Sequence, residues 1–192
     1  DVVYGGSGND RLYGEGGNDY MNGQSGSDRM YGGNGNDQMV GGSGNDYLNG
    51  GKGSDAIHAG SGSDSVSAGD GNDYVAAGDG NDYVHAGNNN DRVDGGNGND
   101  VIHGHYGNDV LNGDAGNDTI NGGSGHDAIH GGSGSDILNG NSDHDIIYGD
   151  GSNDRISGGS GNDIIHDGSG DDYVEGNEGN DVIFSEEGNN WI

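Results

Sequence analysis

The sequence predicts an all-β solenoid, a right-handed parallel β-roll that runs as a single domain over residues 1–192. Two observations lead to this fold class. An aspartate recurs at every ninth position from Asp1 to Asp181, and Asn190 ends the series. An aliphatic residue or methionine follows two residues after each of these positions, which gives 22 repeat units in one register. A short period kept over a whole chain is typical of stacked repeats that contact only their neighbours.

The strand of each unit is expected in the segment D-x-U-x, where U is the aliphatic residue. Alternate side chains of an extended chain point to opposite faces, so the aspartate and U share one side and the two x residues share the other. A strand of three to four residues therefore buries one aliphatic side chain.

The rest of each unit, G-G-x-G-x, is expected to form a loop, because glycine permits positive φ and leaves carbonyl oxygens free to converge. Two strands and two loops, which together make up two repeat units, close one flattened coil. About 11 such coils, at about 4.8 Å per rung, form a rod about 50 Å long. Parallel crossover connections are almost always right-handed, which predicts the hand of the roll.

Loops that lie two repeat units apart stack on one edge of the rod, so their aspartates form two columns. Bare carboxylates one rung apart repel each other, and a hard cation between the rungs removes this repulsion. Calcium is the expected cofactor, because it accepts roughly six to eight oxygen ligands in tolerant geometry. Magnesium requires a stricter octahedron, and zinc or copper would lack a regular set of Cys or His ligands.

About 18 calcium ions are expected between successive loops of the two columns. The predicted metal ligands are the loop aspartates Asp10, Asp19, Asp28, Asp37, Asp46, Asp55, Asp64, Asp73, Asp82, Asp91, Asp100, Asp109, Asp118, Asp127, Asp136, Asp145, Asp154, Asp163, Asp172 and Asp181.

The composition is extreme, with 48 Gly, no Pro, no Cys and a net charge of −29. Such numbers taken alone are typical of disorder. Combined with the periodicity, they predict a chain that stays unfolded until a cation neutralises the acids. The negative charge and the scarcity of Lys and Arg exclude a nucleic-acid partner.

The unit G-G-x-G-x-D-x-U-x resembles the calcium-binding nonapeptide of the repeats-in-toxin (RTX) family, and the resemblance covers the whole chain. It implies calcium binding in a right-handed β-roll. Members of this family are commonly exported by type I secretion and fold outside the cell. Extracellular modules bind calcium at the concentrations found outside cells, which also favours a location outside the cell. We therefore expect a secreted, extracellular or cell-surface protein. Neither an N-terminal signal peptide nor a membrane-spanning segment is expected.

Several units depart from the pattern. Alanine replaces the first glycine at Ala59, Ala68, Ala77 and Ala86. The fourth-position glycine is lost to Asp143 and Ser152, residues that tolerate left-handed backbone, so these loops are expected to be strained but intact. The final segment, 185–192, is the poorest match, and Trp191 is expected to cover the last rung.

Motifs of known catalytic sites and the spacing of an EF-hand are missing, so we expect no catalytic residues and no enzyme activity. Histidines fall mostly at the last repeat position, and only His85 and His103 would lie on adjacent rungs of one face. A solvated strand face is favoured there over a transition-metal clip.

Three classes of function are compatible with these features. The unbroken array favours a calcium-folded structural or adhesive solenoid, in a filament or a surface layer. The alternative is the C-terminal secretion and folding module of a type I-secreted toxin or hydrolase. Ice binding is a weaker alternative, because an ice-binding array needs regular outward Thr and the chain's only Thr is Thr119.

One sheet face of the C-terminal half carries an apolar stripe on five successive rungs, and this stripe is the predicted partner face for self-association or for a neighbouring domain. Its residues are Val110, Ala128, Ile146, Ile164 and Val182. Filling of strand positions by residues of high β-propensity is the competing explanation.

Overall fold

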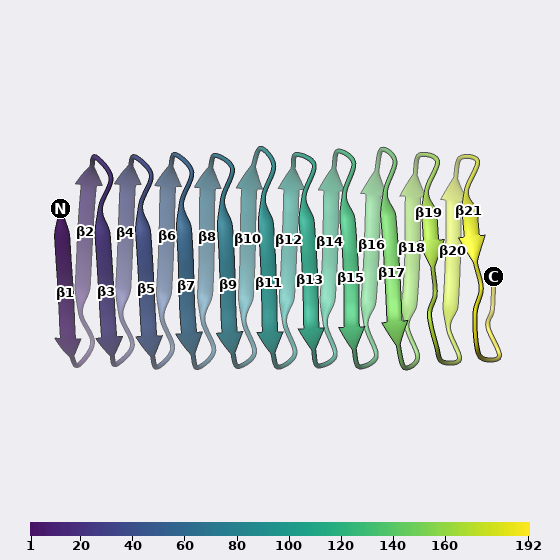
Figure 1. Cartoon of the computed structure of the whole chain (residues 1–192), viewed down its shortest axis with the longest axis horizontal. Helices are drawn as coiled ribbons and strands as arrows, with labels where there is room; N and C mark the ends of the chain where they lie inside the picture. The colour runs from purple at the N-terminus through teal and green to yellow at the C-terminus, as the bar shows by residue number, and fades with distance from the viewer.

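A computed structural model describes all residues, 1–192, and shows a rod of stacked coils built only from β-strands (Figure 1). Odd-numbered strands form one parallel sheet of 11 strands, and even-numbered strands form a second parallel sheet of 10 strands. The chain passes from one sheet to the other at every turn, so the two termini lie at opposite ends of the rod (Figure 1). The all-β solenoid expected from the sequence is confirmed. The chain has no helix that is long and apolar enough to cross a membrane.

The strands of the first sheet are β1 (Val2–Ser7), β3 (Tyr20–Ser25), β5 (Gln38–Ser43), β7 (Ala56–Ser61), β9 (Tyr74–Asp79), β11 (Arg92–Asn97), β13 (Val110–Ala115), β15 (Ala128–Ser133), β17 (Ile146–Gly151), β19 (Ile164–His166) and β21 (Val182–Phe184). The strands of the second sheet are β2 (Arg11–Gly16), β4 (Arg29–Asn34), β6 (Tyr47–Lys52), β8 (Ser65–Asp70), β10 (Tyr83–Asn88), β12 (Val101–Tyr106), β14 (Thr119–Ser124), β16 (Ile137–Ser142), β18 (Arg155–Ser160) and β20 (Tyr173–Glu178).

Most strands are six residues long and cover x-U-x-G-G-x, which is longer than the three to four residues expected. The expectation was wrong because the first two glycines of the repeat continue the hydrogen-bonded ladder instead of leaving it. In β6, for example, Gly51 still pairs with Gly69 of β8, in the next coil. Only three residues, G-x-D, therefore remain between consecutive strands.

The core is a thin layer of aliphatic side chains between the two sheets. Each strand contributes its U residue, and nearly all of these side chains are fully buried. The four alanines at the first repeat position join the same cluster. Burial alternates along every strand, so the loop aspartate, U and the first glycine all face inward, as the period of two requires.

The turns depend on glycine at two positions, the second and the fourth of the repeat, where φ is positive. At the fourth position Gly26 has φ of 122°, and a Cβ there would also overlap the carbonyl oxygen of Gly8 in the preceding coil. The predicted strained but intact loops are present, with φ of 80° at Asp143 and 86° at Ser152. Residues other than glycine are thus accepted at these positions where their side chains can point to solvent.

The C-terminal coil is less regular than the others. Strands β19 and β21 shorten to three residues, and Trp191 pairs with Tyr173 only through an isolated bridge. The Trp191 side chain is 75% exposed, so the expectation that it covers the last rung is wrong.

Candidate metal-binding turns

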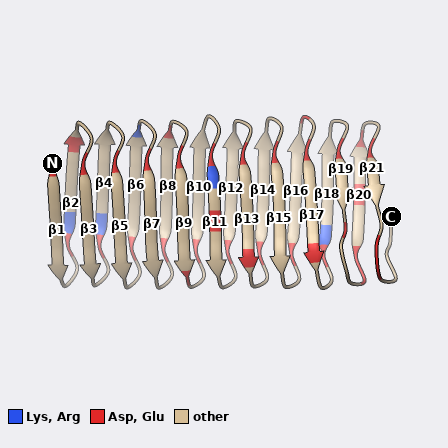
Figure 2. Ribbon diagram, viewed as in Figure 1, with Lys and Arg blue, Asp and Glu red and all other residues tan.

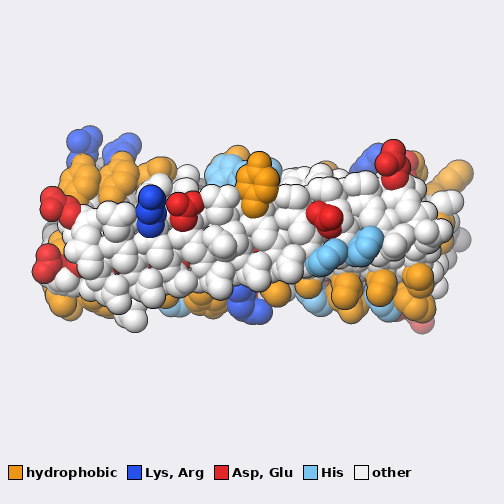
Figure 3. All heavy atoms as spheres, turned by 90° about the horizontal axis from the view of Figure 1, so that it is seen from above, with side chains coloured by type: hydrophobic (Ala, Val, Ile, Leu, Met, Phe, Trp, Pro, Cys, Tyr) orange, Lys and Arg blue, Asp and Glu red, His pale blue; other side chains and the backbone are white.

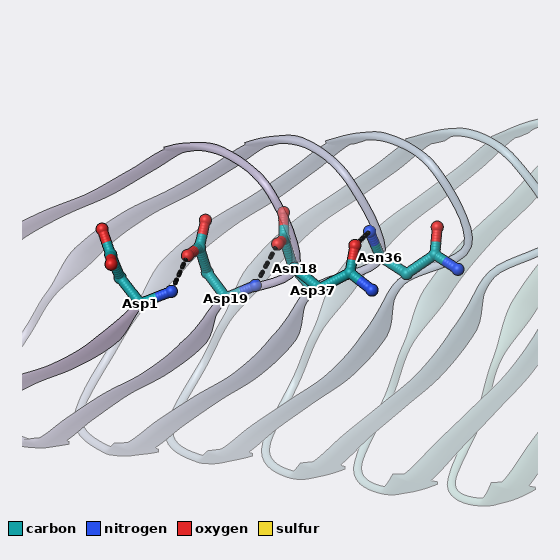
Figure 4. A network of polar contacts seen from close by, with 5 residues as sticks. All are labelled: Asp1, Asn18, Asp19, Asn36 and Asp37. Carbon is teal, nitrogen blue, oxygen red and sulfur yellow. Dashed lines mark hydrogen bonds and ion pairs between the residues drawn. The ribbon is translucent and has the colours of Figure 1, made fainter.

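The repeat aspartates form a continuous hydrogen-bonded ladder along each edge of the rod. From Asp10 to Asp163, the backbone N–H of each repeat aspartate donates to Oδ1 of the matching aspartate in the next coil, at 2.7–3.0 Å. Figure 4 shows the start of one ladder, where Asp19 donates to Asp37 and the N-terminal ammonium group of Asp1 contacts Asp19. The aspartate therefore links two coils by a hydrogen bond that does not depend on a bound ion.

The second carboxylate oxygen, Oδ2, has no partner. From Asp10 to Asp172, the Oδ2 atom of every repeat aspartate is buried without a hydrogen bond. A buried charged oxygen without a partner is costly to a fold, so each of these atoms needs a proton or a cation beside it.

Carbonyl oxygens lie beside these unpartnered atoms. The point where a Cβ on Gly95 would lie is 2.7 Å from Asp100 Oδ2 and 2.8 Å from the carbonyl oxygen of Gly113, in the next coil. At Gly14 the same point is 2.6 Å from both Asp19 Oδ2 and the Gly32 carbonyl. We call the stretch from the first glycine of a repeat to its aspartate a turn segment, and the space between two turn segments stacked in adjacent coils a link. Each link thus gathers oxygens from two coils.

The donor set in the links fits calcium. Carboxylate and carbonyl oxygens are hard ligands, and calcium binds both at about 2.3–2.6 Å. No group of three or more His, Asp or Glu side chains is arranged so that it could hold a metal ion. Carboxylates alone therefore cannot form the site, and backbone carbonyls must complete it, which a flexible oxygen-binding cation tolerates.

The structure places the predicted ligands as the repeat requires. All of the predicted aspartates are buried except Asp10 and Asp181, which lie in the terminal coils and are half-buried. In Figure 2 the acidic residues gather beside the turns at both edges of the rod, whereas basic residues are few. The two expected columns of aspartates are therefore present in the structure.

Burial makes many of these carboxyl groups weaker acids than an exposed aspartate. From Asp37 to Asp172, desolvation raises the pKa of the repeat aspartates, the backbone hydrogen bond from the preceding coil partly lowers it, and in most of them neighbouring carboxylates raise it again. The pKa reaches about 8 for Asp91, about 7 for Asp55, Asp64, Asp118, Asp127, Asp145 and Asp154, and about 6 for Asp73, Asp100 and Asp109. At neutral pH the links thus need either protons or a cation.

A second ladder was not anticipated from the sequence. The residue before each aspartate is most often Asn, and its Oδ1 accepts the backbone N–H of the equivalent residue in the next coil, as in Asn18 with Asn36 at 2.9 Å (Figure 4). His126 and His144 take over this role through Nδ1, which accepts from the backbone at 3.1 and 2.7 Å. The frequency of Asn at this position was the signal that could have indicated the ladder.

The structure brings together a histidine group larger than the expected pair. His85 stacks on His103 with ring centroids 5.1 Å apart, and His105 joins them at 4.8 Å from His85. These rings pack nearly parallel on an exposed strand face. His85 Nδ1 and His105 Nε2 lie 2.5 Å apart, so these two rings share a hydrogen bond. The preference for a solvated strand face over a transition-metal clip stays a prediction.

The predicted apolar stripe is aligned in register on the first sheet, with Ala128 beside Ile146 and Ile146 beside Ile164. Ile146 and Ile164 are each 38% exposed, and Val182 is 48% exposed. One pleat along, His130, Tyr148, His166 and Phe184 form a continuous stack of rings with centroids 4.5–4.9 Å apart. Figure 3 shows hydrophobic and histidine side chains along the lower edge of the rod towards its C-terminal end.

Comparison with known families gives a match along the whole chain. The model of the RTX calcium-binding nonapeptide repeat (four copies) matches overlapping segments, namely residues 1–30, 31–66, 58–93, 67–102, 94–129, 103–138, 130–165 and 157–192. None of the curated proteins matches the chain.

Proposed function

The chain belongs to the RTX calcium-binding nonapeptide repeat family, and from this premise we propose that it is a calcium-folded structural or adhesive rod of a secreted protein, outside the cell or on its surface. RTX repeats bind calcium in a β-roll, and proteins that carry them are typically secreted. This β-solenoid is a structural calcium-binding fold and belongs to no known enzyme family.

The observation that carries the proposal is the series of buried, unpartnered Oδ2 atoms from Asp10 to Asp172. The repeat aspartates and the carbonyl oxygens beside them would hold the ions, about 18 in all if nearly every link is filled. Bound calcium would supply positive charge between coils whose carboxylates otherwise repel each other. The chain's own contribution is to align these oxygens by the aspartate ladder.

The shape of the molecule supports a structural role. The coils repeat from end to end, and the buried repeat aspartates all serve the same inter-coil ladder. The outward strand positions form two long faces that a partner can contact over many rungs. A rod of this kind can hold other structures apart or link them, and such a role requires no catalytic residue.

We further propose that rods associate with one another through the apolar stripe, Val110 to Val182, and the stacked rings beside it. The support is its exposure and continuity: five rungs of aliphatic side chains lie next to four stacked rings on a chain of net charge −29. Burying such a surface removes apolar area from water, which favours association.

A double variant tests this association. Ile146→Lys plus Ile164→Lys should abolish self-association in calcium, measured by sedimentation velocity, and leave the circular dichroism unchanged. The matched control is Gln38→Lys plus Ala56→Lys, which changes two adjacent rungs of the same sheet in the N-terminal half. Assembly of the stripe variant like the parent would show that the stripe only fills strand positions.

A further inference from the structure

Three departures from the repeat meet in one link at the C-terminal end. The first repeat position holds glycine or alanine everywhere except at Asp167 and Ser185. The sixth position holds aspartate everywhere except at Asn190. All three residues belong to the turn segments 167–172 and 185–190, which are neighbours in the rod.

Asp167 lies completely buried between these two turn segments. Its Oδ1 accepts the backbone N–H of Glu186 at 2.7 Å, and its Oδ2 accepts a hydrogen bond from Asn190 Nδ2 at 2.9 Å. Asn190 Nδ2 also donates to Ser185 Oγ at 2.9 Å. Both oxygens of this carboxylate are therefore satisfied by protein donors, unlike those of the repeat aspartates.

The orientation of the Asn190 amide follows from its other contact. Asn190 Oδ1 accepts the backbone N–H of Asp172 at 3.0 Å, the role that Oδ1 of an aspartate has in every other turn segment. The amide nitrogen must then take the place that Oδ2 has in a repeat aspartate, so Asn190 presents a donor where the repeat aspartates present an acceptor. A donor cannot ligate a cation, but it can bind the Asp167 carboxylate.

On the outer side of the same link, a second acid also accepts hydrogen bonds from the next turn segment. Asp171 Oδ1 accepts both the backbone N–H of Asn189 at 2.9 Å and its side-chain Nδ2 at 3.0 Å. Two acids of this turn segment, Asp167 and Asp171, thus face amides of the next, whereas Asp172 keeps a buried Oδ2 without a partner, as in the other links.

We propose that turn segment 185–190 is fastened by a clasp that needs no metal, in which Asp167 and Asp171 hold Glu186, Asn189 and Asn190 through protein hydrogen bonds, in addition to any ion bound at Asp172 Oδ2. Hydrogen bonds to a charged acceptor are about twice as strong as those between neutral groups, so they can hold two turn segments together as a shared ion would. These hydrogen bonds would therefore hold the link between turn segments 167–172 and 185–190 closed whether or not it carries calcium.

Amide hydrogen exchange of the calcium-loaded full chain tests the clasp. Asp167→Gly restores the repeat consensus and removes the clasp, so exchange at Glu186 should become at least about tenfold faster, as expected for the loss of a hydrogen bond to a charged acceptor. Exchange before residue 160 should stay as in the parent. Asp143→Gly, a consensus-restoring change in a distant turn segment, is the control and should leave Glu186 unchanged.

A second variant and a count of bound calcium complete the test. Asp167→Gly plus Asn190→Asp rebuilds an ordinary link, so protection of Glu186 should return and then depend on free calcium. The calcium content of Asp167→Gly should equal that of the parent. Unchanged protection in Asp167→Gly would overturn the proposal, and so would loss of protection together with loss of a bound ion, because Asp167 would then be a calcium ligand. The comparison is made in the folded protein, so its outcome is independent of what the rod does outside the cell.

Discussion

The two carboxylate oxygens of each repeat aspartate have different environments in this protein. One oxygen is used in the ladder between coils and the other is buried without a partner, as at Asp100. Because burial disfavours the charged form, the pKa of these groups rises towards and above neutrality. The same atoms that make the calcium-free fold unstable at neutral pH are therefore the ones that make it responsive to calcium.

The calcium-free chain should gain structure in acid. The folded pKa values of about 6 to 8 lie above about 3.9, the value for Asp in an unfolded chain. Folding then takes up protons, so the stabilisation is complete below about pH 3.9 and is lost as the pH rises through about 6 to 8. Circular dichroism in EDTA between pH 3.5 and 8.5 checks this, and greater β-content at the alkaline end would contradict it.

Glycine at the fourth repeat position is expected to matter for two separable reasons. Gly26→Ala introduces a side chain at φ of 122° and also an overlap with the Gly8 carbonyl, whereas Gly8→Ala has φ of 111° and open space around the Cβ. Left-handed backbone costs about 1–2 kcal/mol in both variants, and the overlap adds about 1–3 kcal/mol to the first. Denaturant unfolding in saturating calcium measures both, and equal effects would show that the overlap relaxes.

At the scale of elements, the period of nine predicted which residues face inward and which turns stack, because side-chain alternation and repeat register are fixed by sequence alone. The strand length could not be predicted, since glycine disfavours strands in general and only the neighbouring coils hold Gly51 and its equivalents in the ladder. The aspartate columns were predicted, whereas Asp167 was not, because its role depends on Asn190, which lies in the next coil.

One link can be weakened without breaking the ladder. Asp100→Asn keeps an Oδ1 to accept the Asp82 N–H, as Asn190 does for Asp172, but replaces the ion-facing oxygen by a donor. Loss of one ion removes about 1.4 kcal/mol at free calcium ten times Kd, so calorimetric titration should require more calcium for folding. The control Asp79→Asn removes the same charge from an exposed turn position and should titrate like the parent.

The whole molecule is a rod in which every coil contacts only its two neighbours. Its core is one layer of aliphatic side chains, and its edges are columns of acid, so burial of apolar surface and charge repulsion act against each other along the full length. In repeat proteins of this kind, stability is a sum of unit and interface contributions. A cation in nearly every link therefore alters the balance for the chain as a whole.

The measurement that tests this account most directly is a calcium titration of the full chain at pH 7.5, followed by circular dichroism and small-angle X-ray scattering. Starting in EDTA, the account predicts an expanded coil that converts cooperatively into the β-rod as free calcium rises, with magnesium far less effective at the same concentration. A rod that keeps its β-signal and its dimensions in EDTA at this pH would contradict it, because the buried aspartate columns would then be stable without a cation.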